Sequence, residues 1–390
     1  MQDNGSVMHP PIAASRGRVS LASANKLSRG EAAIPPSPWM AALLLALLGS
    51  LATAAQARKN MLFFIADDMR PQMNKAYGQK FMHTPNFDAF ADTALVFDHA
   101  YTNFGICSAS RNSFMTGRAP DKTRVWNFIN DFRQGGMSDG VQGQDWVTLP
   151  EFFVKHNMST LGHGKLYHGA GPGGHPPNYD LPRSWSQTQQ YWPATNSGCR
   201  NDMEAGEYGV RYCPDGKSDP SDFSDVNVTG HAIDTLKANA AAYKATGANF
   251  ALFLGLHFPH QSWYVPEWAS KKYSPISATA APTHPVAPTN CAPVGFTAEL
   301  DGNPYLAVDQ AMIDAIGESS SHPPSVAGKV VQVPCPWPGN NSVPVWMQKQ
   351  LRVGYYSAVT HTDWLFGQVM TELDATGVQD DTLVLVTGDQ

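Results

Sequence analysis

A potential nucleophile lies beside a permanent positive charge in the stretch Cys107, Ser108, Ala109, Ser110, Arg111. We predict that Cys107 begins a helix, because the unpaired N–H groups and partial positive charge of a helix N-terminus favour an anion. Arg111, one turn further on, adds a cation that can also orient the nucleophile, and these surroundings would lower the pKa of a thiol. The pattern favours nucleophilic attack on an anionic ester of unspecified kind. The alternative is a buried apolar thiol or one half of a disulfide.

Acidic side chains end two short apolar segments that have the pattern of buried parallel strands. Asp67 and Asp68 follow residues 60–66, and Asp389 follows residues 382–387. Neighbouring carboxylates at a strand end repel each other and are costly to desolvate, and a hard cation removes that cost. We therefore expect a metal site at these strand ends. The alternative for Asp67 and Asp68 is the solvated start of a loop.

Lys165 and His168 lie in a glycine-containing segment, residues 159–168, for which we predict a short loop. Its two glycines allow a sharp turn that would project both side chains from one place. The lysine can hold an anionic group, and the histidine can transfer protons near neutral pH. Taken singly, each is more often a solvated surface residue.

Two histidines, His257 and His260, follow a third apolar segment, residues 249–256. Open α/β sheets bind ligands at the carboxyl ends of their strands, so one of these histidines is a candidate proton donor. We favour His260, with His257 as its neighbour. The spacing also suggests a pair of zinc ligands, but the sequence offers no obvious third one.

The elements that would position these residues alternate between apolar strands and helices. We predict a capped helix that begins after Thr84 with Pro85 at its first position. An alanine-rich helix over 230–244 and a helix over 346–376 follow later in the chain. A length of 390 residues favours one α/β domain of about 300 residues, or such a domain plus a fragment.

The composition excludes one broad class of function. The chain is 42% hydrophobic and 15% charged, with a net charge of -6, which allows a large core. A nucleic-acid-binding protein would normally carry a basic stripe, so we expect no nucleic-acid partner. A polyanionic substrate remains compatible with this charge, since a small basic pocket can lie within an acidic total.

The first 57 residues have the pattern of a secretory leader. Residues 1–38 are polar and irregular, and we expect either disorder or an artefactual extension there. Residues 39–57 hold a leucine-rich run closed by Ala-Gln-Ala, which is typical of a signal peptide cleaved after Ala57. The run is too short and its second half too polar for a stable membrane span. We therefore expect the secretory pathway, with a lysosomal or extracellular destination.

Two further features agree with secretion. N-glycosylation sequons begin at Asn157, Asn227 and Asn340. Besides Cys107 the chain has four cysteines, and an even number suggests disulfides: Cys199, Cys213, Cys291 and Cys335. Pairing the first with the second would close a short loop, and pairing the third with the fourth would staple a proline-rich excursion over 274–345. The other two pairings stay open.

The motifs together resemble the sulfatase family. Cys-x-Ala-x-Arg at 107–111, followed by Thr-Gly-Arg at 116–118, is similar to the family signature, with alanine where most members carry proline. The Asp-Asp pair, Gly-Lys-x-x-His at 164–168 and Gly-Asp at 388–389 are similar to further family motifs in the same order. The similarity is greatest to the iduronate-2-sulfatases. It implies an α/β sandwich of the alkaline-phosphatase-like kind, with a mostly parallel central sheet flanked by helices. Residues 58–390 would be its catalytic domain, truncated at the C-terminus.

The resemblance also implies an activity, the removal of sulfate from a sulfated carbohydrate. The formylglycine-generating enzyme would oxidise Cys107 to formylglycine, whose hydrate is the nucleophile. The implied catalytic residues are Cys107, Arg111, Lys165, His168 and His260, with either His260 or a lysine as the acid for the leaving alcohol. The implied Ca²⁺ ligands are Asp67, Asp68, Cys107, Asp389 and Gln390, the last in place of the usual asparagine or histidine.

Two alternatives to a sulfatase stay open. A phosphodiesterase or phosphonate hydrolase could use the same scaffold. A non-catalytic, truncated secreted fragment would carry the motifs without the activity.

Overall fold

The computed structural model describes the chain in several stretches. These are residues 60–126, 132–133, 143–168, 180–181, 183–186, 191–192, 204–205, 211–213, 223–260, 263–275, 278–283 and 345–390. The predicted N-terminal extension, the signal peptide, the disulfides and most of the 274–345 excursion lie outside the described residues and side chains, and they stay predictions.

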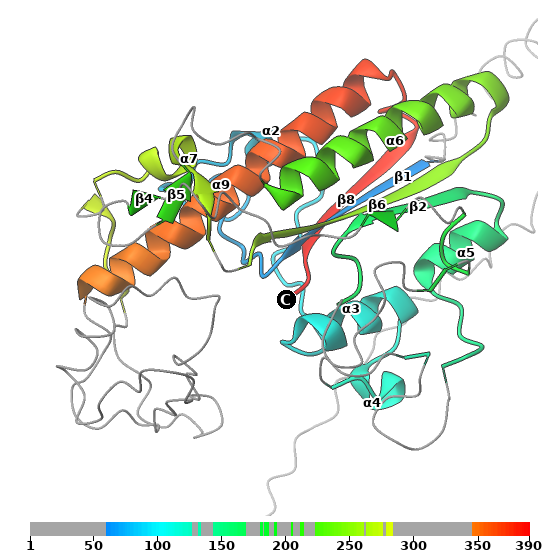
Figure 1. Ribbon diagram of the computed structural model, residues 1–390, viewed down its shortest axis with the longest axis horizontal. Coiled ribbons are helices and arrows are strands. Elements are labelled where there is room, and N and C mark those ends of the chain that lie inside the picture. Colours follow the sequence, from blue (N-terminus) through cyan, green and yellow to red (C-terminus); the bar gives the residue numbers. More distant parts are fainter. Residues whose placement is uncertain are drawn as a thin grey trace, which may run out of the picture. The chain divides into compact units, whose positions relative to one another are not determined.

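A parallel five-stranded sheet forms the centre of the described structure (Figure 1). Its strand order is β3-β2-β6-β1-β8, and every neighbouring pair is parallel. The strands are β1 (Asn60–Asp67), β2 (Ser159–Gly164), β3 (Tyr191–Trp192), β6 (Phe250–Pro259) and β8 (Thr382–Gly388). The apolar runs of β1 and β6 form the middle of the sheet because both of their faces are buried.

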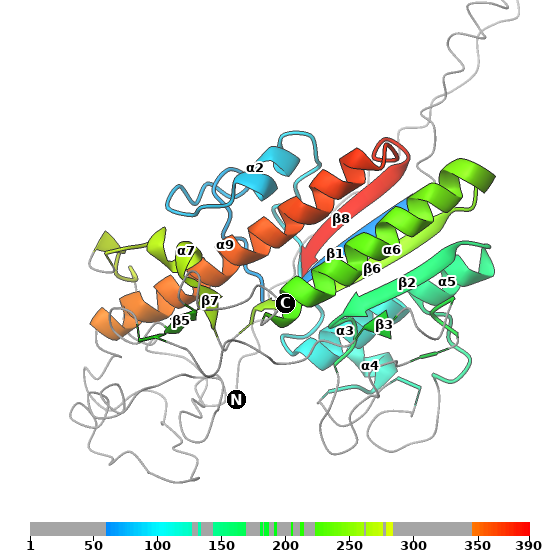
Figure 2. The ribbon, with the colours of Figure 1, turned by 45° about the horizontal axis from the view of Figure 1, so that its top comes forward.

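Helices cover both faces of this sheet (Figure 2). On one face lie α2 (Pro85–Ala91), α6 (Ser224–Thr246) and α9 (Val345–Ala375), and on the other lie α3 (Cys107–Thr116), α4 (Pro120–Thr123) and α5 (Leu149–Lys155). Alternate side chains of β1 contribute to two hydrophobic cores, one on each face of the sheet. Leu62 and Phe64 pack under α6 and α9, whereas Phe63 and Ile65 pack under α3 and α5. The predicted α/β fold with a mostly parallel sheet flanked by helices is confirmed.

A second, three-stranded sheet lies beside α9. Strands β4 (Glu204–Ala205), β5 (Arg211–Cys213) and β7 (Val265–Pro266) form it in the order β4-β5-β7, and α7 (Glu267–Lys271) follows directly. The helices predicted over 230–244 and 346–376 are confirmed as α6 and α9. Within the described residues, no helix is long and apolar enough to cross a bilayer.

Two local predictions were wrong. The loop predicted over 159–168 begins instead as strand β2, because the segment has a parallel partner in β6, and only the residues after Gly164 turn away. The helix predicted after Thr84 is present, but the Thr84 side chain does not cap it. The buried carboxylate of Asp363, on α9, accepts hydrogen bonds from the backbone N–H groups of Asn86 and Phe87 at 3.2 and 2.7 Å. The N-terminus of this helix is therefore capped by a carboxylate from far along the chain and not by the neighbouring Thr84 hydroxyl.

Candidate active site

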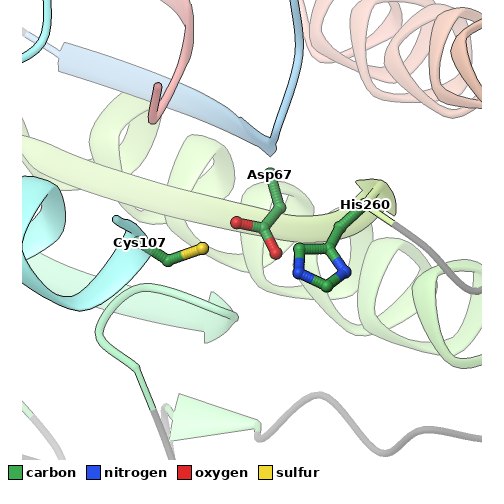
Figure 3. Close-up of side chains that lie close together, drawn as sticks. All are labelled: Asp67, Cys107 and His260. Carbon is green, nitrogen blue, oxygen red and sulfur yellow. The ribbon is translucent and has the colours of Figure 1, made fainter. Parts of the chain in front are cut away.

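The predicted site residues meet where β1, β6 and β8 end and α3 begins. Because these three strands are parallel neighbours, their carboxyl ends lie at one edge of the sheet. Figure 3 shows the Asp67 carboxylate between the Cys107 sulfur and the His260 ring, and one ligand atom of each lies within 4.8 Å of the others. The end of the sheet therefore brings a thiol, a carboxylate and an imidazole together.

Arg111 ties two strand ends to α3. Its guanidinium donates to Asp67 Oδ1 at 3.0 Å and to Asp389 Oδ2 at 2.9 Å, and it also donates to the carbonyl of Lys165. The arginine and both carboxylates are almost fully buried. Burial opposes the charge of Arg111, but the carboxylates of Asp389 and Asp67 raise the pKa of the guanidinium. Arg111 is thus a fixed, buried cation.

Asp67 stays ionised despite its burial. Burial alone would raise its pKa, but the charges of Lys165 and Arg111 hold the pKa of this carboxyl well below its usual range. The Lys165 ammonium donates to Asp67 Oδ2. Burial raises the pKa of Asp389 to about 6 against the opposing charge of Arg111. The two strand-end carboxylates therefore share one arginine but differ in how readily they accept a proton.

Asp68 points into the site because the backbone turns sharply after β1. Its φ is 57°, a left-handed conformation unusual for a residue other than glycine. The Asp68 N–H donates to Asp389 Oδ1 at 2.9 Å. The Tyr355 hydroxyl donates to the Asp68 carbonyl at 2.8 Å and accepts from the Arg70 N–H at 2.8 Å. Contacts from Asp389, directly after β8, and from Tyr355 on α9 thus hold a costly turn in place.

Cys107 begins α3, as predicted, but the state of its thiol differs from the prediction. Cys107 is buried, with Sγ 4.0 Å from Asp68 Oδ1 and 3.5 Å from Gln390 Nε2. Burial and the nearby Asp67 carboxylate raise the pKa of this thiol far above its usual value. The helix N-terminus and the two cations do not offset them, so the prediction of a lowered pKa was wrong. Cys107 is a neutral thiol here, a poor nucleophile as it stands.

Two histidines, His257 within the last residues of β6 and His260 directly after the strand, face the strand-end carboxylates. His257 Nδ1 lies 3.9 Å from Asp67 Oδ2, and His260 Nε2 lies 3.6 Å from Asp68 Oδ2. The two rings are 4.8 Å apart between centroids. Each ring is about one-fifth exposed, whereas the Asp67 side chain is fully buried. The histidines therefore lie on the open side of the site, where a leaving group could reach them.

The residues present fit a hard divalent cation. Carboxylate oxygens of Asp67, Asp68 and Asp389 lie within 4.8 Å of one another. The buried Oε1 of Gln390 has no hydrogen-bond partner among the described residues. The three carboxylates outnumber the neighbouring Arg111 and Lys165 by one negative charge. An unpartnered amide oxygen beside an excess of carboxylate is a donor set that suits Ca²⁺.

The contacts described above bring the predicted residues Asp67, Asp68, Cys107, Arg111, Lys165, His260, Asp389 and Gln390 together at the strand ends. His168 is half-buried and lies three residues beyond Lys165, and its role stays a prediction. Sequence reasoning missed Ser110, whose hydroxyl donates to the Asp389 carbonyl, and Tyr355. Ser110 lies inside the 107–111 motif and could have been weighed there. Tyr355 contacts Asp68 across 287 residues of sequence, and no local pattern points to it.

Comparisons with known proteins agree with this geometry. A family model described as Sulfatase matches residues 59–390. Iduronate 2-sulfatase from Mus musculus is 28% identical over 371 residues, which covers 91% of this chain and 60% of the relative. The Homo sapiens enzyme is 27% identical over 363 residues, covering 90% and 59%. A solved phosphonate monoester hydrolase from Agrobacterium radiobacter has a TM-score of 0.54 at 16% identity, covering 85% of this chain and 62% of that one. The chain thus spans about 60% of the length of these curated relatives.

Proposed function

The chain belongs to the sulfatase family, and from this premise we propose that it hydrolyses the sulfate ester of a sulfated sugar of the kind that an iduronate 2-sulfatase accepts. One observation carries the proposal. Two cations, Arg111 and Lys165, converge on the buried Asp67 beside the motif cysteine. Preorganised positive charge of this kind stabilises an anionic transition state, and it is usually the largest electrostatic contribution to catalysis.

Ca²⁺ is the proposed metal. Asp67, Asp68 and Asp389 would hold it, with Gln390 supplying an amide oxygen that has no hydrogen-bond partner among the described residues. When bound, a hard cation polarises the oxygens of an anionic ester and lowers the cost of gathering three carboxylates.

Cys107 is the proposed precursor of formylglycine, made by a formylglycine-generating enzyme. A buried neutral thiol with a strongly raised pKa would be a weak nucleophile, which favours conversion over direct attack by sulfur. The aldehyde, once hydrated, supplies a hydroxyl nucleophile at the N-terminus of α3. Gln390 Nε2, 3.5 Å from Sγ, is placed to orient the group at position 107.

The remaining roles fall to side chains already in place. Arg111 and Lys165 hold the negative charge of the ester. His260 is the proposed acid for the departing alcohol, because its ring lies on the open side of the carboxylates. His257 is its neighbour. His168 is proposed to assist the release of sulfate. Lysosomal or extracellular delivery through the predicted signal peptide completes the proposal.

The test combines mass spectrometry with a substrate comparison. The full chain is produced in a secretory host with a formylglycine-generating enzyme, and the peptide that carries Cys107 is analysed. We expect the mass of the aldehyde and Ca²⁺-dependent hydrolysis of 4-nitrocatechol sulfate. Cys107→Ala is the control. An unmodified thiol in an inactive chain would contradict the proposal and favour the truncated, non-catalytic fragment.

A second candidate follows from the likeness to a phosphonate monoester hydrolase. That enzyme shares the fold at 16% identity, so the likeness concerns the scaffold alone. Rates on matched aryl sulfate, phosphate diester and phosphonate monoester substrates separate the candidates. We expect the sulfate to react fastest, and a faster phosphonate would replace the sulfatase assignment.

A further inference from the structure

The ladder between β1 and β6 is interrupted beside the site. Ala66 pairs with Leu256, but the next residue of β1, Asp67, pairs with Pro259. Two residues of β6, His257 and the one after it, therefore bulge out of the ladder. Such bulges re-aim side chains and leave backbone groups without their usual partners. The bulge lies at the end of β6, where His257 and His260 are found.

A buried carboxylate accepts hydrogen bonds from both backbone N–H groups of the bulge. Asp225, in the first turn of α6, accepts from the His257 N–H at 2.9 Å and from the Phe258 N–H at 2.7 Å, one on each carboxylate oxygen. Only 1% of Asp225 is exposed. A buried N–H without an acceptor costs about 1–3 kcal/mol, so without Asp225 two such costs would oppose this backbone path.

The bulge also determines where the two rings point. The His260 N–H donates to the His257 carbonyl at 3.0 Å and closes a turn directly after the bulge. That turn places the rings 4.8 Å apart between centroids. One ring faces Asp67 and the other faces Asp68. If β6 stayed in register to its end, the alternation of side chains would move at least one ring away from the site.

We propose that Asp225 is a positioning residue for the reaction: its carboxylate holds the bulge of β6 that presents His257 and His260 to the substrate. The inference rests on the proposed sulfatase function. Asp225 touches neither the strand-end carboxylates nor position 107 through any described hydrogen bond, and it acts through the backbone of the histidine-bearing turn.

The chain supplies a matched control in Asp363. This residue is also 1% exposed, and its carboxylate also accepts two backbone N–H groups, those of Asn86 and Phe87. Burial raises the pKa of each aspartate to about 6. Asp363 holds the start of α2, away from the strand ends. Asp225→Asn and Asp363→Asn therefore make the same chemical change, and only the first would alter the histidine turn.

The test measures kinetics and ring geometry on the full chain. We expect both variants to lose similar thermal stability. Asp225→Asn should lower kcat on 4-nitrocatechol sulfate about 10- to 100-fold with KM changed less than about 3-fold, as expected for a displaced transition-state contact. Asp363→Asn should keep the kcat of the unmutated chain. In histidine-labelled protein, the nuclear Overhauser effect between the His257 and His260 rings should vanish only in Asp225→Asn.

Two results would overturn the inference. One is an Asp225→Asn variant that keeps both its kcat and the ring-to-ring effect. The other is an equal fall of kcat in both variants, which would assign Asp225 a purely structural role. If the unmutated chain hydrolyses no sulfate ester, the proposed function fails, and the ring-to-ring measurement still decides whether Asp225 holds the turn.

Discussion

Two partly buried clusters of charged side chains in this molecule use similar residue types for different purposes. We call the first the strand-end cluster (Asp67, Asp68, Asp389, Arg111 and Lys165) and the second the Arg133 cluster (Arg133, Glu151, Asp180 and Arg183). In the Arg133 cluster the two arginines and the adjoining, exposed Lys155 face two carboxylates, so each carboxylate is paired with at least one cation. In the strand-end cluster three carboxylates face two cations, so one negative charge is in excess.

The hydrogen bonds of the two clusters differ in the same way. Arg133 donates to both oxygens of Asp180 at 2.8 Å and to Glu151 at 3.0 Å. Burial would raise the pKa of Glu151, but its bonds to Arg183, Lys155 and Arg133 lower it. In the strand-end cluster the pKa of Asp389 is raised to about 6, and a buried amide oxygen of Gln390 has no hydrogen-bond partner in the part of the chain that the structure describes. A structural cluster satisfies its own charges, whereas a ligand site leaves a donor set for something else to complete.

The largest loss of activity is expected from a substitution that disrupts only the strand-end cluster. Asp67→Asn removes the carboxylate that Arg111 and Lys165 share, so those cations are no longer held in position for an anion. We expect kcat on 4-nitrocatechol sulfate to fall about 10³-fold. Turnover kinetics measure this. The variant should also lose thermal stability, because the lowered pKa of Asp67 means that its charge stabilises the folded state, so kcat is measured on the folded fraction. Activity within 10-fold of the unmutated chain would remove Asp67 from the mechanism.

The second prediction breaks the Arg133 cluster instead. Glu151→Gln removes the negative partner of Arg133, Arg183 and Lys155. We expect the free energy of unfolding to fall by about 3 kcal/mol, as when one member of a buried pair is removed, while the kcat of the folded fraction is unchanged. Urea denaturation measures the free energy of unfolding, and steady-state kinetics on the same sample measure kcat. A large loss of kcat without a loss of stability would erase the contrast between the clusters.

Metal binding should stabilise the protein through the strand-end cluster. Ca²⁺ at 100 times its Kd would add about 2.7 kcal/mol by mass action, and a chelator should remove this gain. Differential scanning calorimetry with and without Ca²⁺ measures the shift in Tm. Glu151→Gln should keep the Ca²⁺-dependent shift, whereas Gln390→Leu should reduce it. An equal shift in both variants would place the cation elsewhere.

The last prediction concerns the pH dependence of stability and a buried histidine that has no counter-charge among the described residues. His361 is packed among aromatic rings on α9, and burial lowers its pKa to about 3. Because the unfolded chain would protonate it near its usual pKa while the folded chain would not, stability should fall as the pH drops from about 6.5 towards 3. The slope from this residue is up to about 1.4 kcal/mol per pH unit. His361→Phe should flatten the profile of Tm against pH over that interval, and an unchanged profile would contradict the prediction.

Much of the site could be predicted because it depends on strand ends. Asp67, Asp68 and Asp389 follow apolar runs, and parallel strands bring such ends together whatever the loops do. The state of Cys107 was mispredicted because the pattern reveals the helix N-terminus but not the burial or the Asp67 carboxylate. The strand at 159–164 and the contact of Tyr355 with Asp68 depend on partners far along the chain. No local rule supplies them.

The partners of Arg111 impose an order on the molecule's own synthesis. Asp67 lies 44 residues before the arginine, but Asp389 lies 278 residues after it. At about 5–20 residues per second, a ribosome needs about 15 to 55 seconds to travel from Arg111 to Asp389. During that interval the nascent chain holds a guanidinium destined for the interior with only half of its carboxylates available. The arrival of β8 is thus the event that lets this edge of the sheet close, and any polypeptide released before it would expose an unfinished core to chaperones and proteases.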